Sequence, residues 1–117
     1  MSVLLKFKKN WADEFNAEGF IILTLEQVCI LEVIAKDYPD TKTSFYFGTN
    51  EGWDDITLKE LMDHTTRTPI SKQEHDTLTK LFPECTRYGY GQIWDSEVFF
   101  YEEDERIEKL ANKFYDN

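Results

Sequence analysis

Cysteine, proline and glycine are all scarce in this sequence, which has two, three and five of them among its 117 residues. The two cysteines, Cys29 and Cys85, allow at most one disulfide, so the fold must depend on a packed core. No apolar stretch reaches the roughly 20 residues of a membrane-spanning helix. The N-terminal lysines follow a very short apolar run, which is the reverse of a secretory signal. We therefore expect a cytoplasmic protein with free thiols.

Motifs for catalysis and for metal binding are also missing. The soft metal ligands are the two cysteines, His64 and His75, and their spacing matches no zinc site. Residues 50–55 lack the alternating acidic positions of a calcium loop. No lysine directly follows Gly48 or Gly52, as it would in a phosphate-binding loop, and no Gly-x-Ser-x-Gly nucleophile motif is present. We predict a protein that is not an enzyme and has no catalytic residues, metal or cofactor.

The charge of the chain is strongly one-sided. Acidic residues outnumber basic residues by 23 to 13, which gives a formal net charge of −10. Phosphate groups repel such a surface, so direct binding to nucleic acid or to an anionic membrane is disfavoured. A protein with a basic surface is the natural partner. The alternative is that the acidity only keeps the protein soluble.

The composition predicts one globular domain over residues 1–117, because 41% of the residues are apolar and the length is typical of a single domain. The fold class expected is α+β, with a small mixed or antiparallel sheet of about five strands packed by helices in the order ββαβααββα. The alternation and helical spacing place strands at 3–8, 20–23, 44–47, 87–94 and 98–101, and helices at 25–37, after Thr57, after Ser71 and from near Glu102.

Three capping boxes support the helix predictions. Threonine or serine stands three residues before glutamine or glutamate in the pairs Thr24–Gln27, Thr57–Glu60 and Ser71–Glu74. Residues 10–18 and 48–55 are expected to be loops. Within the helices we expect Cys29, Leu78, Leu81 and Phe82 to be buried, whereas Cys85 and His75 are expected at the surface.

The acidic residues gather in a few segments. Residues 10–32 contain five acidic residues and no basic one, and residues 95–108 contain seven against Arg106 alone. Trp11 and Trp53 lie in the expected loops beside acidic residues, a composition typical of interface anchors, although either ring could instead close the end of the core. The predicted partner-binding residues are Trp11, Asp13, Glu14, Glu18, Glu51, Trp53, Asp54, Asp55, Glu102, Glu103, Asp104 and Glu105.

In general composition the chain is similar to phage-encoded inhibitors of host defence and to toxin-neutralising immunity proteins, with no shared motif. The leading hypothesis is a protein-binding inhibitor or adaptor, a monomer or homodimer, that blocks a basic site on a partner protein. A special form of it is mimicry of nucleic acid by carboxylates. Two alternatives remain: an assembly subunit that self-associates through apolar strands, and a small-ligand-binding or enzymatic α+β domain.

Overall fold

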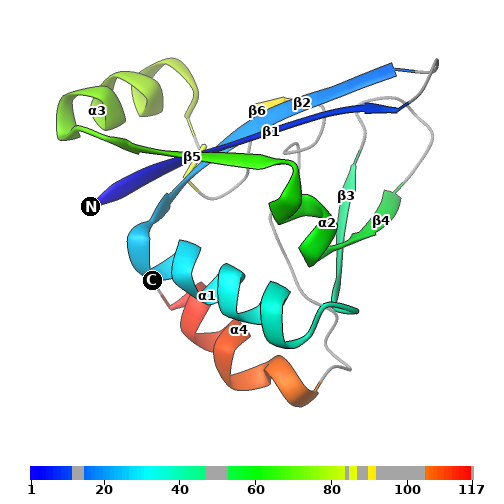
Figure 1. Cartoon of the computed structure of the whole chain (residues 1–117). Helices are drawn as coiled ribbons and strands as arrows, with labels where there is room; N and C mark the ends of the chain where they lie inside the picture. Colours follow the sequence, from blue (N-terminus) through cyan, green and yellow to red (C-terminus); the bar gives the residue numbers. More distant parts are fainter. Residues whose placement is uncertain (12–14, 47–52, 84, 87–89, 92–104, 117) are drawn as a thin grey trace.

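Two antiparallel sheets and four α-helices make up the part of the chain that the structure describes (Figure 1). This part of the computed structural model comprises residues 1–11, 15–46, 53–83, 85–86, 90–91 and 105–116. At positions 9–11, 15–18, 42–46, 53–56 and 90–91 the description covers the backbone alone.

A long hairpin is the centre of the larger sheet. Its strands are β1 (Ser2–Trp11) and β2 (Phe15–Thr24), paired from Ser2 opposite Thr24 to Trp11 opposite Phe15. Strand β5 (Thr65–Ile70) pairs with β1, and the short β6 (Tyr90–Gly91) pairs with β2. The strand order is therefore β5-β1-β2-β6, with every neighbouring pair antiparallel.

The smaller sheet is a second hairpin, formed by β3 (Lys42–Tyr46) and β4 (Trp53–Thr57). The helices are α1 (Leu25–Asp37), α2 (Leu58–Asp63), α3 (Lys72–Leu81) and α4 (Glu108–Tyr115), the last preceded by one 3-10 turn, η1 (Glu105–Ile107). In Figure 1 helices α1, α2 and α4 lie below the larger sheet, and α3 lies apart from them near the N-terminus.

The helices begin where the sequence provides caps. Thr24 accepts from the backbone amide of Gln27, whose side chain accepts from the amide of Thr24 in return. Ser71 and Glu74 form the same reciprocal pair at α3. At α2 the hydroxyl of Thr57 accepts from the amide of Glu60. The predicted starts of these three helices are confirmed because a cap depends only on residues three apart.

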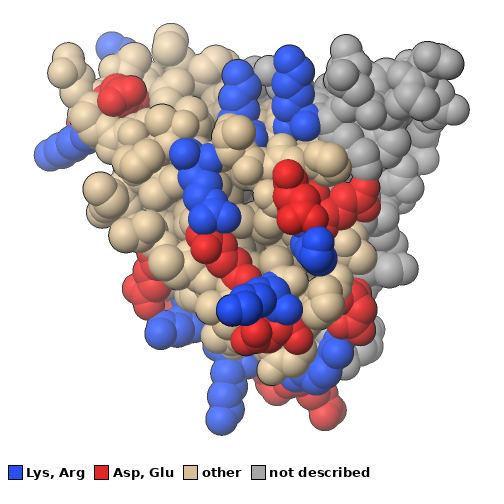
Figure 2. All heavy atoms as spheres, in the orientation of Figure 1, with Lys and Arg blue, Asp and Glu red and all other residues tan. Residues whose placement is uncertain are grey.

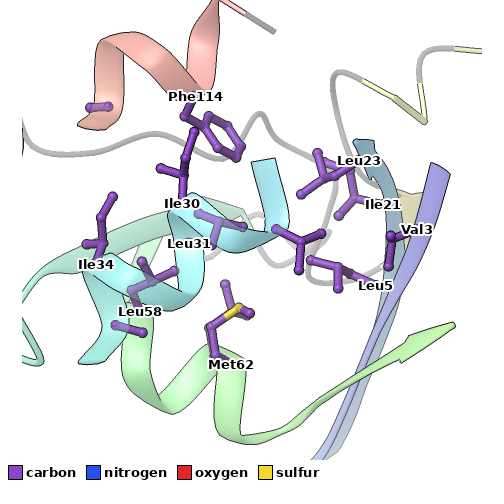
Figure 3. Close-up of a cluster of buried hydrophobic side chains, with 14 of the residues drawn as sticks. Val3, Leu5, Ile21, Leu23, Ile30, Leu31, Ile34, Leu58, Met62 and Phe114 are labelled. Carbon is purple, nitrogen blue, oxygen red and sulfur yellow. The ribbon is translucent and has the colours of Figure 1, made fainter. Parts of the chain in front are cut away.

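The main core lies between one face of the larger sheet and helices α1, α2 and α4 (Figure 3). Side chains alternate along a strand, so Val3, Leu5 and Phe7 of β1 share this face, with Ile21 and Leu23 opposite them on β2. All five are buried, and the helices contribute Val28, Ile30, Leu31, Ile34, Ala35, Leu58, Leu61, Met62, Ile107, Ala111 and Phe114.

A smaller cluster covers part of the opposite face of the sheet. Ile22, Ile70 and Cys85 are its buried members, and Leu78 and Phe82 of the α3 region are only partly buried against them. The ring of Phe82 meets the ring of Phe20 edge to face, with centroids 5.4 Å apart. Helix α3 itself contains no fully buried residue.

The α+β class is confirmed, but five strands in the predicted order are not. The described residues include two strands that periodicity did not predict, β4 and β5. Strand β5 consists of Thr65–Ile70, whose four central side chains are all exposed, so no alternation of apolar and polar residues marks it. The expected strand at 98–101 lies outside the described residues. Of the expected strand at 87–94 only residues 90–91 are described, and they form β6.

The burial predicted for each of the two cysteines is wrong: Cys29 is exposed and Cys85 is buried. Cys29 is exposed, because it follows the buried Val28 by a rotation of about 100° and so turns away from the core. Cys85 is 1% exposed, because its carbonyl accepts from the amide of Ile22 and its amide donates to Phe82, which draws the segment onto the sheet.

Two predictions for α3 are also wrong. Leu81 is 65% exposed rather than buried, since the side of the helix that faces the sheet carries His75, Leu78 and Phe82. His75 is half-buried rather than at the surface, because its ring meets Ser2 at the start of β1.

Candidate functional site

The first group of predicted partner-binding residues lies at the far end of the β1–β2 hairpin. Trp11 ends β1 opposite Phe15, and Glu18 pairs with Lys8. The prediction of a loop over residues 10–18 is wrong at both ends, since the pairing of β1 with β2 continues to these residues. Asp13 and Glu14 lie outside the described residues.

The second group lies at the start of β4. Trp53, Asp54 and Asp55 pair in register with Tyr46, Phe45 and Ser44 of β3. They were expected in a turn-rich loop, and the pairing with β3 corrects this. Glu51 lies outside the described residues. Both tryptophans therefore stand at the last described pair of a hairpin, each opposite another aromatic residue.

The third group precedes α4. Glu105 is exposed at the first position of η1, where a carboxylate suits the free amides of the first turn. Glu102, Glu103 and Asp104 lie outside the described residues. The structure thus places the described candidates at two hairpin ends and at the entry to α4, and does not show them joined in one surface.

Four of the other ten described acidic side chains form ion pairs with basic ones. Four ion pairs join elements or turns of the described residues: Lys59–Asp63 at 2.7 Å, Arg67–Glu32 at 2.6 Å, Arg106–Asp40 at 3.1 Å and Lys113–Glu26 at 3.5 Å. All eight side chains are well exposed, so each pair contributes little to stability, about 0–1 kcal/mol. Their main effect is local cancellation of charge. Figure 2 shows the face of the molecule that is turned to the viewer in Figure 1, and over its described part red and blue spheres lie side by side.

A count of charges shows where the acidic surplus lies. The described side chains include eleven of the 23 acidic residues and ten of the 13 basic ones, which is close to balance. The other twelve acidic and three basic residues fall within segments 9–18, 42–56 and 84–104. Nearly all of the net charge of −10 therefore belongs to the two hairpin ends and to the segment that precedes η1. The described body of the fold is close to neutral.

Contacts of Arg106 join η1 to the residues that follow α1, and the sequence analysis did not identify them. The guanidinium of Arg106 donates to both carboxylate oxygens of Asp40, at 3.2 and 3.1 Å, and lies over the ring of Tyr38 at 5.4 Å. Arg106 is the only basic residue in the acidic segment 95–108, a sequence signal that could have suggested an anchoring role.

Both histidine side chains contact β1. Nδ1 of His75 is 2.8 Å from the hydroxyl of Ser2, and the ring of His64 meets that of Phe7 edge to face. The hydrogen bond of Ser2 with His75 joins α3 to the sheet, and among the described residues no ion pair of His75 with a carboxylate is found. Within the same residues, no three His, Cys, Asp or Glu side chains are grouped as metal ligands.

Comparison with known proteins adds no further assignment: no family model, no curated protein and no solved structure matches the chain. None of the helices in the described residues is both long and apolar enough to cross a lipid bilayer.

Proposed function

We propose that the chain is a protein-binding inhibitor or adaptor whose acidic segments occupy a basic site on a partner protein. The observation that carries the proposal is the separation of charge: the helices and the core sheet are nearly neutral, while two hairpin ends and the segment before η1 hold the acidic surplus. Acidity needed only for solubility has no reason to avoid the helical surface.

The position of the surplus suits binding. The β1–β2 hairpin, which leads to the first of these segments, is held by the main core through Leu5, Phe7 and Ile21. Concentrated negative charge speeds the encounter with a basic surface and selects against acidic ones. Trp11 and Trp53 are the residues we propose as apolar anchors, because tryptophan is enriched among residues that dominate binding energy. Where the basic site is a nucleic-acid-binding groove, the carboxylates would stand in for phosphates.

The test compares two variants with equal charge. The first neutralises the proposed site by Glu102→Gln, Glu103→Gln and Asp104→Asn. The second neutralises three exposed residues of the body, by Asp63→Asn, Asp76→Asn and Asp116→Asn. Both change the net charge from −10 to −7. The immobilised proteins are used to capture partners from the source cells, with elution by rising salt.

We expect the first variant to lose its partner at a lower salt concentration than the second, which should behave like the unmodified protein. Electrostatic binding also predicts that the affinity of the captured complex falls steeply between about 50 and 200 mM salt. Over this range the Debye length shortens to about 10 Å and less, so that added ions screen the attraction between exposed charges. Equal behaviour of the two variants would show that only total charge matters. A complex insensitive to salt would remove the electrostatic basis of the proposal.

A further inference from the structure

Helix α1 has more apolar surface than the core covers. Eight of its thirteen residues are apolar, a composition typical of a helix buried on most sides. Its inner side packs on the sheet, on α2 and on α4 through Val28, Leu31 and Ile34. Its outer side nevertheless exposes Leu25 (48%), Val33 (43%) and Cys29. These three residues are spaced four apart, so they form one stripe along the helix.

Ion pairs border this stripe on both sides. Glu32 pairs with Arg67 of β5, and Glu26 pairs with Lys113 of α4. Figure 2 shows α1 from this side, with uncharged surface between groups of red and blue spheres. An apolar centre with a polar, charge-compensated border is the usual anatomy of a protein interface.

We infer that this outer face of α1 is a homodimer interface in which two copies of α1 pack antiparallel about a twofold axis. A second copy fits because the charges along the stripe are complementary to themselves. Glu26 lies at the N-terminal end and Lys36 at the C-terminal end, and Lys36 has no ion-pair partner among the described residues. Antiparallel packing with Cys29 opposite Val33 of the second copy brings each Lys36 to the other copy's Glu26.

The net charge of −10 does not oppose this arrangement. Around the stripe the exposed acidic residues Glu26, Glu32 and Asp37 are balanced by Lys36, Arg67 and Lys113. Two copies that meet here therefore bring together locally neutral surfaces, while their acidic segments belong to other parts of the chain. This inference does not depend on the proposed function, although a dimer would present two acidic sites to a partner.

The test measures the oligomeric state of the whole chain by sedimentation equilibrium from micromolar to several hundred micromolar concentration. A single-helix interface is small, so we expect a dissociation constant on the order of micromolar to tens of micromolar. Val33→Asp should weaken the dimer by about tenfold or more, because a carboxylate would be buried in the apolar stripe. The matched control is Leu81→Asp, which adds the same charge at an exposed leucine on α3.

A second pair of variants tests the charge complementarity. Lys36→Glu should weaken the dimer, since it places two carboxylates together, whereas Lys80→Glu in the last turn of α3 should leave it unchanged. A short bismaleimide should also link Cys29 of one copy to Cys29 of the other in the unmodified protein. Cys29→Ser should abolish that product, because Cys85 is buried.

The cross-link needs no variant at the apolar stripe, so it keeps the inference testable if Val33→Asp fails to fold. Circular dichroism of each variant checks the fold. A protein that stays monomeric across the whole concentration range overturns the inference. So does a dimer that Val33→Asp and Leu81→Asp weaken equally, or one that Cys29 cannot link.

Discussion

The side-chain amide of Gln27 donates to the backbone carbonyl of Phe114 at 3.1 Å and joins the first turn of α1 to the last turn of α4. The same side chain also accepts from the backbone amide of Thr24 and so completes the capping box of α1. One residue thus has a local function that the sequence predicts and a tertiary function, 87 residues away along the chain, that the sequence does not reveal.

This double use makes Gln27 more important than an ordinary capping residue. We expect Gln27→Ala to lower the free energy of unfolding by about 1–2 kcal/mol, since it removes one capping bond and one partly buried bond to a carbonyl. The control is Glu74→Ala, which breaks the equivalent capping box of α3, where the glutamate bonds to no other element within the described residues. Urea denaturation compares the two. Equal losses would show that the bond to Phe114 contributes nothing.

Local signals account for most of what the sequence predicted well. The caps at Thr24, Thr57 and Ser71 place three helix starts correctly, and the end of α1 at Asp37 was also expected. The apolar spacing of Ile107, Ala111 and Phe114 gives the buried side of α4. Each of these depends on residues within one or two helical turns of each other.

Long-range contacts account for what the sequence could not predict. Helix α1 is apolar on nearly every side, so its pattern does not say which side meets the sheet, and Cys29 was assigned to the wrong one. Strand β5 has no apolar alternation and exists because its backbone pairs with β1. For the candidate site, the acidic segments are evident from the sequence, but the structure is needed to show that the helices and the core sheet around them, as far as their side chains are described, are nearly neutral.

Thr41 offers a test of an unpaired buried group. Its side chain is 3% exposed, and its hydroxyl has no hydrogen-bond partner among the described residues. Both of its backbone groups are hydrogen-bonded. The amide of Thr41 donates to the carbonyl of Tyr38 at 3.0 Å, and the carbonyl of Thr41 accepts from the amide of Leu58 at 2.7 Å. A buried hydroxyl without a partner costs free energy, so we expect Thr41→Val to raise the free energy of unfolding by about 1 kcal/mol.

The control for this prediction is Thr41→Ser, which keeps the hydroxyl and removes a buried methyl group. It should lower the free energy of unfolding by about 1 kcal/mol. Thermal and urea denaturation measure both variants. If Thr41→Val destabilises the protein, the hydroxyl has a partner that compensates its burial.

The two thiols should differ sharply in reactivity. Burial raises the pKa of the Cys85 thiol above its ordinary value of 9.0, although a hydrogen bond with its own backbone opposes this in part. Both burial and a smaller thiolate fraction slow its alkylation. At pH 8 we expect one fast-reacting thiol, Cys29, and a second that reacts only on unfolding. Mass spectrometry after a short maleimide treatment, with Cys29→Ser as control, counts them.

The same burial has a consequence for stability at high pH. The folded state favours the neutral form of the Cys85 thiol. The contribution of the buried thiol to the free energy of unfolding is therefore fully present below the ordinary pKa of 9.0, and it is lost as the pH rises through the higher pKa of the folded state. Stability should therefore decline above about pH 9 more steeply in the unmodified protein than in Cys85→Ala. Parallel pH profiles of the two proteins would contradict this.

Helix α3 should be the least stable helix of the described fold. It buries no residue completely and rests on the sheet through Leu78, Phe82 and the hydrogen bond of His75 with Ser2. Helix α1, in contrast, buries five residues in the main core. Elements with few buried apolar contacts open without global unfolding. We expect the amides of residues 76–81 to exchange with deuterium at least about tenfold faster than those of residues 30–35, a difference of about 1.4 kcal/mol.

Removal of the α3 contacts should act on α3 alone. Phe82→Ala deletes the ring that meets Phe20, and we expect it to speed exchange in residues 76–81 while leaving residues 30–35 nearly unchanged. Leu81→Ala, at an exposed position of the same helix, is the matched control and should change neither segment. Native-state hydrogen exchange resolved by segment measures both variants. If Phe82→Ala speeds exchange equally in α1 and α3, the smaller cluster belongs to the same cooperative unit as the main core, and α3 does not open by itself.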